Sequence, residues 1–285
     1  MRSEEKLKQY KWPIKAYKNA DFLNSPSARL IRIMSEMIEP GTRFRKYGVR
    51  DTVVFFGSAR TLPKKVAQAN LRRIEIKLNR QKAQSVGLKR KHGQAKRDLI
   101  MSQYYEDAVN LAEKLTRYFK TGKRKRRNAV ICTGGGPGIM EAANRGAKRA
   151  GGKSIGLNIS LPMEQYPNAY QSKELAFEFH YFFVRKFWFF NLARVLIVFP
   201  GGFGTMDELF ELLTLIQTGK SKKCISVVLY GKEYWQEIIN FDKMIHWGTI
   251  SKQDLKLFNV FDKVDDLFRY VKDEIEHKQI RRTKR

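Results

Sequence analysis

Residues 194–208 read RVLIVFPGGFGTMDE, a continuously apolar, β-branched stretch that runs into three glycines and then into a helical pattern. A strand that is hydrophobic at every position is typical of a parallel sheet covered by helices on both faces. Residues 128–141, NAVICTGGGPGIME, show the same order of strand, glycine loop and helix. The chain therefore contains two strand–loop–helix units of the kind from which α/β proteins are built.

Similar apolar runs recur along the chain, with amphipathic helical patterns between them. Besides the strands within 128–134 and 194–200, we expect strands at residues 51–57, 153–159, 177–183 and 224–230 and a short edge strand at 259–261. We expect helices at residues 27–38, 104–119, 138–150, 205–218, 233–246 and 264–276. No tight hairpin signal joins two strands, so an antiparallel α+β arrangement is the less favoured alternative. We predict an α/β fold with a three-layer, Rossmann-like, doubly wound parallel sheet.

The predicted domain is extended at its N-terminus and interrupted by a basic segment. We expect an N-terminal helical extension at residues 1–50 and the Rossmann-like domain at residues 51–276. Residues 64–100 are expected to form an inserted basic helix or helical hairpin with a break at Gly87, and residues 277–285 a basic tail.

The net charge of the 285-residue chain is +28, from 56 Lys and Arg against 28 Asp and Glu. Residues 64–97 contain twelve Lys and Arg and one acid, whereas residues 120–127 and 278–285 contain six and five basic residues and no acid. A hydrophobic content of 42% excludes a disordered basic tail protein. Because most of the excess charge lies in segments that look peripheral, we treat the charge and the chemistry as separate questions.

The cysteines, the histidines and the N-terminus limit the class of protein further. Cys132 and Cys224 lie in apolar runs and form no disulfide framework, which favours a reducing compartment. No signal peptide or membrane-spanning run is visible, so we expect a soluble, cytoplasmic protein without a membrane partner. The four histidines show no metal-ligand spacing, so no metal site is expected.

The two glycine loops predict a phosphate site. Glycines let the backbone approach a ligand closely, and a helix that begins directly after them presents free N–H groups and the positive end of its dipole. Neither loop has the P-loop ending or the G-x-G-x-x-G spacing, so a merely tight turn remains an alternative. The expected phosphate-binding residues are Gly134, Gly135, Gly136 and Gly138 in the first loop and Gly201, Gly202, Gly204 and Thr205 in the second.

Glu208 lies one turn into the helix that follows the second loop. A carboxylate near a phosphate is electrostatically unfavourable unless it has a task, which favours a catalytic or sugar-binding role. Stabilisation of its own helix dipole is the alternative, and Asp207 could serve that purpose equally well.

These motifs resemble the LOG family, whose members are often mislabelled lysine decarboxylases. PGGFGTMDE (residues 200–208) is similar to the family's PGGxGTxxE motif, and GGGPGIME (134–141) to its other glycine loop. The resemblance extends over roughly residues 20–275 and includes FFGSAR (55–60), LPMEQYPN (161–168) and VRKFWF (184–189). The insertion at 64–100 departs from the compact members, so the longer FFGSAR type is the nearer comparison.

The resemblance implies an enzyme, a phosphoribohydrolase that cuts the N-glycosidic bond of a nucleoside 5′-monophosphate to a free base and ribose 5-phosphate. The implied substrates are cytokinin ribotides, AMP or related monophosphates. The family's essential Arg and Glu correspond to Arg185 and Glu208. The reaction passes through an oxocarbenium-like sugar, which a carboxylate stabilises. The planar guanidinium group of an arginine can bind phosphate, bind ribose or orient Glu208.

Other positions carry weaker expectations. We expect Ser58 and Arg60 to contact the nucleotide, with helix capping as the alternative for Ser58. Glu141 lines the sugar or complements a helix dipole, and Lys186 is as readily a solvated lysine as a site residue. We interpret Asn158, Glu164 and Asn168 as base-reading or base-covering residues. The aromatic cluster at residues 177–190 is interpreted as core and subunit interface rather than a base-stacking platform.

No cofactor is expected, because no motif places a lysine for pyridoxal phosphate. The family implies a homodimer or a higher homo-oligomer. Two alternatives remain open: a nucleotide-sensing module that does not cut its ligand, and a nucleic-acid-associated protein. Solvated basic faces explain the charge more simply than nucleic-acid binding, which is possible but not favoured. The preferred base is left open.

Overall fold

The computed structural model describes residues 12–80, 85–121, 129–161, 166–220, 223 and 225–283. The chain divides into two compact units, Met1–Thr42 and Arg43–Arg285. In the first unit, η1 (Ala16–Lys18), α2 (Ala20–Asn24) and η2 (Pro26–Ala28) precede the start of α3 (Arg29–Lys46). Asn19 caps α2 by accepting the N–H of Phe22 at 3.1 Å. The helix expected at residues 27–38 lies within η2 and α3.

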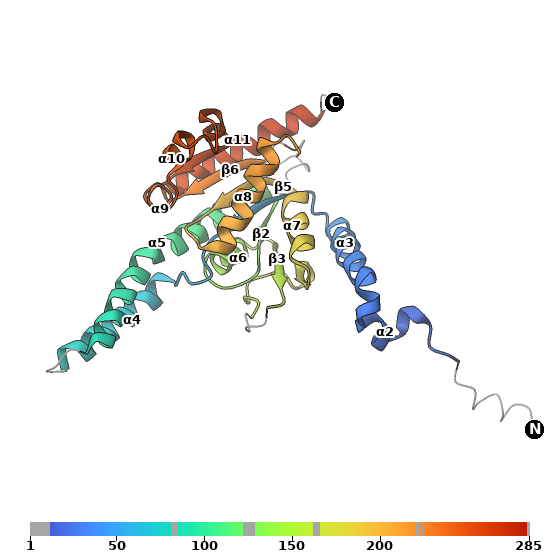
Figure 1. The fold of residues 1–285 in the computed structure, drawn as a ribbon, viewed down its shortest axis with the longest axis horizontal. Helices are drawn as coiled ribbons and strands as arrows, with labels where there is room; N and C mark the ends of the chain where they lie inside the picture. The colour runs from blue at the N-terminus through green and yellow to red at the C-terminus, as the bar shows by residue number, and fades with distance from the viewer. Residues whose placement is uncertain are drawn as a thin grey trace, which may run out of the picture. The chain divides into compact units, whose positions relative to one another are not determined.

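The second unit is built on a seven-stranded sheet in the order β4-β3-β2-β1-β5-β6-β7 (Figure 1). All neighbouring strands run parallel. The strands are β1 (Asp51–Phe56), β2 (Ala129–Thr133), β3 (Ser154–Ile159), β4 (Ala176–Phe179), β5 (Ala193–Val198), β6 (Ser226–Tyr230) and β7 (Phe258–Phe261). The predicted α/β fold with a Rossmann-like parallel sheet is confirmed.

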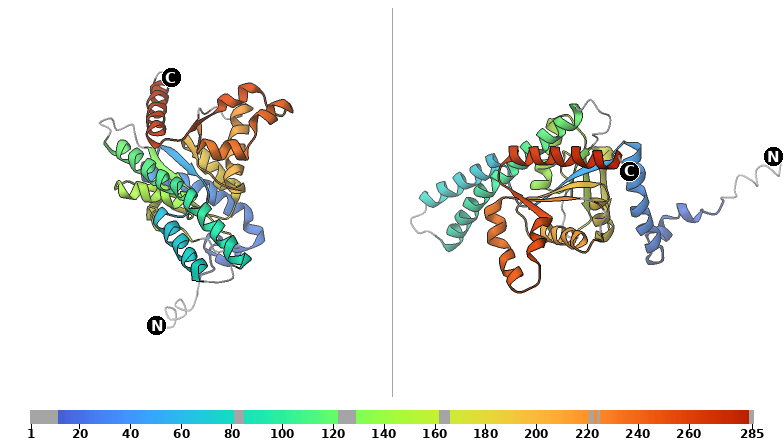
Figure 2. Two further views of the ribbon diagram at one scale, coloured as in Figure 1. Left: turned by 90° about the vertical axis from the view of Figure 1, so that its left-hand side faces the viewer. Right: turned by 90° about the horizontal axis from the view of Figure 1, so that it is seen from above.

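Helices cover both faces of this sheet (Figures 1 and 2). One face is covered by α5 (Val86–Thr121), α6 (Ile139–Arg149) and α11 (Val264–Thr283), and the other by α7 (Phe182–Asn191) and α8 (Phe203–Gln217). The remaining elements are α4 (Lys64–Arg80), η3 (Lys173–Leu175), α9 (Lys232–Ile238), α10 (Phe241–His246) and η4 (Lys252–Leu257). Two helical layers around one sheet explain why the strands are apolar at successive positions.

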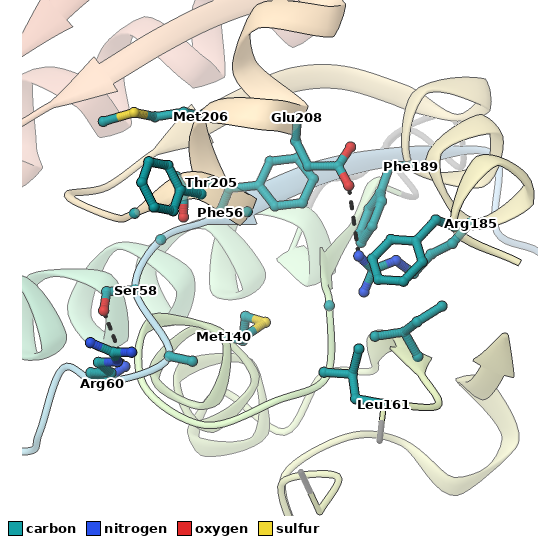
Figure 3. Close-up of a pocket in the computed structure, with 18 residues that line it drawn as sticks. Phe56, Ser58, Arg60, Met140, Leu161, Arg185, Phe189, Thr205, Met206 and Glu208 are labelled. Atoms are coloured by element: carbon teal, nitrogen blue, oxygen red, sulfur yellow. Dashed lines mark hydrogen bonds and ion pairs between the residues drawn. The ribbon is translucent and has the colours of Figure 1, made fainter. Parts of the chain in front are cut away.

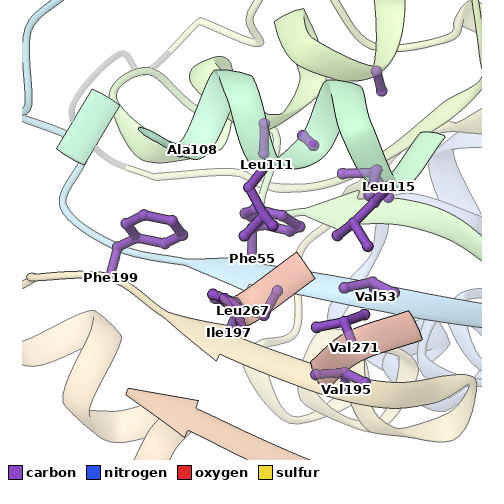
Figure 4. Packing of buried hydrophobic residues seen from close by; sticks show 14 of the residues in the cluster. Val53, Phe55, Ala108, Leu111, Leu115, Val195, Ile197, Phe199, Leu267 and Val271 are labelled. Atoms are coloured by element: carbon purple, nitrogen blue, oxygen red, sulfur yellow. The ribbon is translucent and has the colours of Figure 1, made fainter. Parts of the chain in front are cut away.

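Side-chain alternation along β1 shows how the two layers are packed. Val53 and Phe55 point into a cluster with residues of α5, α11 and β5, including Leu111, Leu115 and Val271 (Figure 4). Phe56, one residue further along, points to the opposite face, where its ring packs edge-on at 4.7 Å from that of Phe189 in α7. Successive side chains of a strand point to opposite faces of the sheet. A strand that is buried on both faces must therefore be apolar at successive positions.

Besides α11, which was expected to end at residue 276 and continues to Thr283 into the expected basic tail, three elements differ from their predicted bounds. The helix expected at residues 104–119 is the C-terminal part of α5, which begins at Val86, so Gly87 lies in its first turn and breaks nothing. The strand expected at 177–183 ends at Phe179, and Phe182 begins α7. Val184 and Trp188, four residues apart, are buried on one side of that helix, a helical period that an aromatic-rich run conceals.

The third difference is the helix expected at residues 233–246, which is two helices, α9 and α10. Asn240 separates them, because its side chain accepts the N–H of Lys243 at 2.9 Å and so caps the start of α10. Cys224, expected in β6, lies outside the described residues. In the part of the chain that the structure describes, no helix combines the length and apolarity needed to cross a membrane.

Gly146 of α6 lies directly against the backbone of α5, and we expect Gly146→Ala to destabilise the fold. A Cβ at this position would lie 2.2 Å from the carbonyl oxygen of Val109. Overpacking of this kind costs about 1–3 kcal/mol. Urea unfolding should show this decrease in the free energy of unfolding. Gly93→Ala, in the same helix pair but with only the end of Arg97 near its added Cβ, should instead stabilise by about 0.5–1 kcal/mol. Equal effects of the two substitutions would contradict the packing described.

Candidate functional site

The candidate site lies where the strand order of the sheet reverses. The chain builds β1 to β4 outward on one side and then places β5 on the other side of β1. Open α/β sheets bind ligands outside the carboxyl ends of the strands at such a switch point. A cavity of about 570 Å³ lies there, lined by the segments after β1, β2, β3 and β5 and by α7 (Figure 3).

The described lining residues are Phe56, Gly57, Ser58, Ala59, Arg60, Gly134, Met140, Ile159, Leu161, Phe182, Arg185, Phe189, Gly202, Phe203, Gly204, Thr205, Met206 and Glu208. Both glycine loops and the FFGSAR segment thus contribute to one cavity, as the sequence led us to expect. No lysine is among these residues. Within the described ranges, no group of His, Cys, Asp or Glu is arranged to hold a metal ion.

The first glycine loop requires glycine because of its backbone conformation and its close neighbours. Gly138 has φ +71°, and a Cβ there would lie 2.2 Å from the carbonyl oxygen of Ser58. Gly135 has φ +75°, and its Cβ would lie 2.0 Å from Oδ1 of Asn158. Residues that carry a side chain rarely adopt this backbone conformation, and a side chain would not fit at these two positions. The loop is therefore held tightly against the segment that follows β1.

The second loop leaves open space over a helix start. A Cβ at Gly202 or Gly204 would have no atom within 4 Å, and both residues line the cavity. The N–H groups of Thr205 and Met206 are bonded to the Gly202 carbonyl at 2.9 and 3.0 Å. The 15-residue helix α8 begins here, so its dipole places partial positive charge at the cavity wall. This end of the cavity suits an anion.

Side-chain amides hold the first glycine loop from behind. Asn168 Nδ2 donates to the carbonyl oxygens of Gly135 and Gly136 at 2.8 and 2.9 Å. Gln171 Nε2 donates to the same Gly135 oxygen at 2.7 Å. Asn158 Nδ2 donates to Gln171 Oε1 at 3.0 Å and to the carbonyl of Phe177 at 2.8 Å. Asn158 and Asn168, expected to face the base, instead support the loop, and neither lines the cavity.

Glu208 and Arg185 face each other across the cavity wall. Arg185 Nη2 lies 3.8 Å from Glu208 Oε1, with side chains only 14% and 3% exposed. The guanidinium lies 5.1 and 5.5 Å from the ring centroids of Phe182 and Phe189. Arg185 Nε and Glu208 Oε2 are buried without a hydrogen-bond partner among the described residues. Each group of this pair thus keeps a buried polar atom whose bonding capacity is not used by the described residues.

Burial dominates the protonation of this pair. It raises the pKa of Glu208 to about 7, although the charges of Arg185 and Lys186 act in the opposite direction. Burial likewise lowers the pKa of Arg185, an effect that Glu208 partly offsets. A carboxyl group with a pKa near neutrality is common where acid–base chemistry is performed.

The remaining predicted residues divide into those that reach the cavity and those that do not. Ser58 and Arg60 line it, and Ser58 Oγ accepts the Arg60 N–H at 3.1 Å. Lys186 lies outside the lining and is paired with Asp207 at 2.8 Å and with Glu211 at 2.6 Å. Glu141 also lies outside it and accepts the hydroxyl of Tyr105 at 2.7 Å. Gly135, Gly136, Gly138 and Gly201 shape the loops without lining the cavity, and Glu164 lies outside the described residues.

The apolar wall of the cavity was not assigned from the sequence. Phe182 and Phe189 belong to the aromatic cluster interpreted as core and subunit interface; Phe189 is buried in the core, and both residues also line the cavity from α7. Phe203, the variable residue of the second glycine motif, is 93% exposed at the rim. Gln171 was not singled out at all. The available signal was the helical spacing of Phe182, Arg185 and Phe189, which places them on one face of α7.

Comparison with known proteins gives a family match over the central and C-terminal parts of the chain. A family model described as "Possible lysine decarboxylase" matches residues 140–271. The chain is 26% identical over 151 residues to a cytokinin riboside 5′-monophosphate phosphoribohydrolase, LOG7, of Arabidopsis thaliana, covering 52% of this chain and 64% of that protein. It is 25% identical over 140 residues to a probable enzyme of the same name, LOGL5, of Oryza sativa subsp. japonica, covering 48% and 56%.

The chain thus spans about three fifths of the length of the curated relatives it matches. Among solved structures, it is similar to TM1055, at 17% identity and a TM-score of 0.45, over 78% of this chain and 99% of that one. It is also similar to the molybdenum cofactor carrier protein of Chlamydomonas reinhardtii, at 18% identity and a TM-score of 0.42, over 80% and 99%. The resemblance to the LOG family is confirmed by the family model and the two plant relatives.

The raised pKa of Glu208 predicts a pH-dependent stability. The folded protein keeps a proton that the unfolded chain releases above pH about 4.5, so this contribution is present at low pH and is lost as the pH rises through about 7. We expect the unfolding free energy of the wild type, relative to Glu208→Gln, to fall by about 2.5 kcal/mol between pH 5 and pH 8.

Urea unfolding at several pH values measures this difference. Glu237→Gln, at an exposed carboxylate of α9, is the matched control and should differ from the wild type by a constant amount. A pH-independent difference for Glu208→Gln would mean that this carboxylate is solvated in the folded protein.

Proposed function

We propose that this protein hydrolyses the N-glycosidic bond of nucleoside 5′-monophosphates and releases the free base and ribose 5-phosphate. The observation that carries the proposal is the buried Glu208 carboxyl group, 3.8 Å from Arg185 in a cavity bounded by two glycine loops. The two curated relatives are named as phosphoribohydrolases, which supports a hydrolase of the LOG family. Cytokinin ribotides and AMP are the candidate substrates.

The phosphate of the substrate binds at the second glycine loop. The start of α8 supplies N–H groups and a favourable dipole, and Gly202 and Gly204 leave the space above it empty. Thr205, on the same turn, adds a hydroxyl group at the cavity wall. Arg60, exposed in the segment after β1, supplies positive charge on the other side of the cavity.

The ribose lies against Glu208. As the glycosidic bond breaks, positive charge develops on the sugar, and a carboxylate in a site of low solvent exposure stabilises it more strongly than it would in water. Arg185 favours the ionised form of Glu208 and holds the group in place. Glu208 Oε2, which is buried without a hydrogen-bond partner among the described residues, is the oxygen that a ribose hydroxyl or the attacking water would engage. The carboxylate is therefore the reactive form.

The base lies against the apolar wall of the cavity. Phe182, Phe189, Met140 and Leu161 present ring and thioether surface there. Aromatic side chains stack on planar bases, and methionine adapts to irregular shapes. This wall favours a flat, partly apolar base and accommodates an apolar substituent on it.

A substrate panel tests the proposal directly. Pure protein is incubated with AMP, GMP, CMP, UMP and isopentenyladenosine 5′-monophosphate, and free base and ribose 5-phosphate are measured by chromatography. We expect release from at least one monophosphate and much less from adenosine, which lacks the phosphate. If all the monophosphates remain intact, the hydrolase proposal fails. Thermal stabilisation by AMP without release would favour the sensing module.

Substitution of the central pair should separate chemistry from folding. We expect Glu208→Gln to lower kcat by a factor of about 10² to 10³, because the neutral amide cannot stabilise the sugar cation. The wild-type kcat/KM should rise with pH and level off above about 7, as Glu208 ionises. Glu237→Gln is the control and should leave both unchanged. Wild-type activity in Glu208→Gln would remove this residue from the mechanism.

A further inference from the structure

We propose that the hairpin of α4 and the N-terminal part of α5, residues 64–100, binds the phosphate backbone of double-stranded nucleic acid. The two helices lie side by side and extend away from the sheet (Figures 1 and 2). α4 contains 17 residues, so this arm is about 25 Å long. The hairpin starts four residues after Arg60, and none of its described residues lines the cavity.

The packing of the hairpin turns its charge outward. Buried or half-buried apolar residues recur on α4 at spacings of three and four, at Ala67, Leu71, Ile74 and Leu78, and on α5 at Leu88, Ala95 and Leu99. This spacing forms one apolar face per helix. Every described Lys and Arg of the segment is exposed: Lys64, Lys65, Arg72, Arg73, Lys77, Arg80, Lys89, Arg90, Lys91, Lys96 and Arg97.

These positive charges are not neutralised within the hairpin. Residues 64–100 contain two acids: Glu75, which lies 3.6 Å from His92, and Asp98, which accepts from the side chain of Gln94 at 2.6 Å. Arg97 donates to the neutral side chain of Gln94 at 3.0 Å. Among the described residues, no ion pair joins the exposed basic side chains of this segment to a carboxylate. So many like charges on one arm repel one another, and a polyanion that binds them relieves the repulsion.

The composition of the arm selects the kind of polyanion. Residues 64–100 contain no Phe, Tyr or Trp, so the arm lacks the large rings on which unpaired bases stack. Membrane-surface helices need a continuous free apolar face. Here the apolar faces of α4 and α5 pack against each other, and only scattered apolar residues, such as Ile76 and Ile100, are exposed. A pair of packed helices is also too wide for a duplex groove of about 12 Å. Sequence-independent contact with duplex phosphates is the mode that remains.

Fluorescence anisotropy of a labelled 25-base-pair duplex tests the proposal with the full chain. One series of measurements uses DNA and a second series uses RNA of the same length, because both present the same phosphates. We expect binding at 50 mM salt that weakens steeply with salt. Each phosphate contact contributes about −0.9 to the slope of log K against log salt for B-DNA. Absence of binding to either duplex at 50 mM salt would overturn the proposal.

Two triple variants with the same loss of charge locate the binding surface. Arg73, Lys77 and Arg80 share one face of α4, and changing all three to Gln should reduce the size of the slope by about 2 to 3. Affinity at 100 mM salt should fall at least 10-fold. Lys232, Lys243 and Lys252 are exposed elsewhere, and changing these to Gln should alter affinity less than 3-fold. Equal weakening by both triples would assign binding to net charge alone and overturn the proposal.

A charge-preserving variant guards against loss of folding. Arg73→Lys with Arg80→Lys keeps the positive charge of the arm and should retain wild-type binding within about 3-fold, since point charges suffice for phosphate contact. Loss of duplex binding in this variant, with an unchanged circular dichroism spectrum, would contradict phosphate contact. Tighter binding to vesicles with anionic lipid than to duplex would instead point to a membrane surface and overturn the proposal.

Discussion

A carboxyl group buried beside a buried arginine is the constraint on which the rest of this site depends. Glu208 is only 3% exposed, and its nearest charged partner, Arg185, is too distant at 3.8 Å for a strong hydrogen bond. Burial of a charge is costly unless the charge is paired and hydrogen-bonded, which explains why the pKa of Glu208 rises to about 7. A fold retains such a group where a ligand completes its bonding.

The sheet and the glycine loops bring the other groups to this carboxyl. Parallel strands direct the segments after β1, β2 and β5 to one edge, and the reversal of strand order opens the crevice between them. Gly138 allows the first loop to lie against Ser58, whereas Gly202 and Gly204 keep the start of α8 clear. The glycines therefore act in two ways, some permitting close packing and others leaving room for a ligand.

The sequence was sufficient for the fold and for the centre of the site, because both depend on local patterns. Doubly buried strands are apolar throughout, and Gly-rich turns before helices are visible directly. The strand expected at 177–183 did not place Phe182 in a helix, and Gln171 was not singled out, because the positions of both depend on distant partners. An aromatic run fits a strand or a helix equally well, and Gln171 acts on Gly135, 36 residues earlier. Asn168 and, through Gln171, Asn158 support the first glycine loop, and their expected part in reading or covering the base stays a prediction.

The excess positive charge and the chemistry occupy different parts of the molecule, since the basic arm contributes no described residue to the cavity. Nucleotide hydrolysis is therefore assigned to the cavity alone. A crystal structure of the Glu208→Gln variant with AMP would show where the nucleotide binds. We expect the phosphate on the N–H groups at the start of α8, the ribose against position 208, and the adenine beside Phe182 and Phe189. AMP bound outside this cavity, or with its phosphate at the apolar wall, would contradict this assignment.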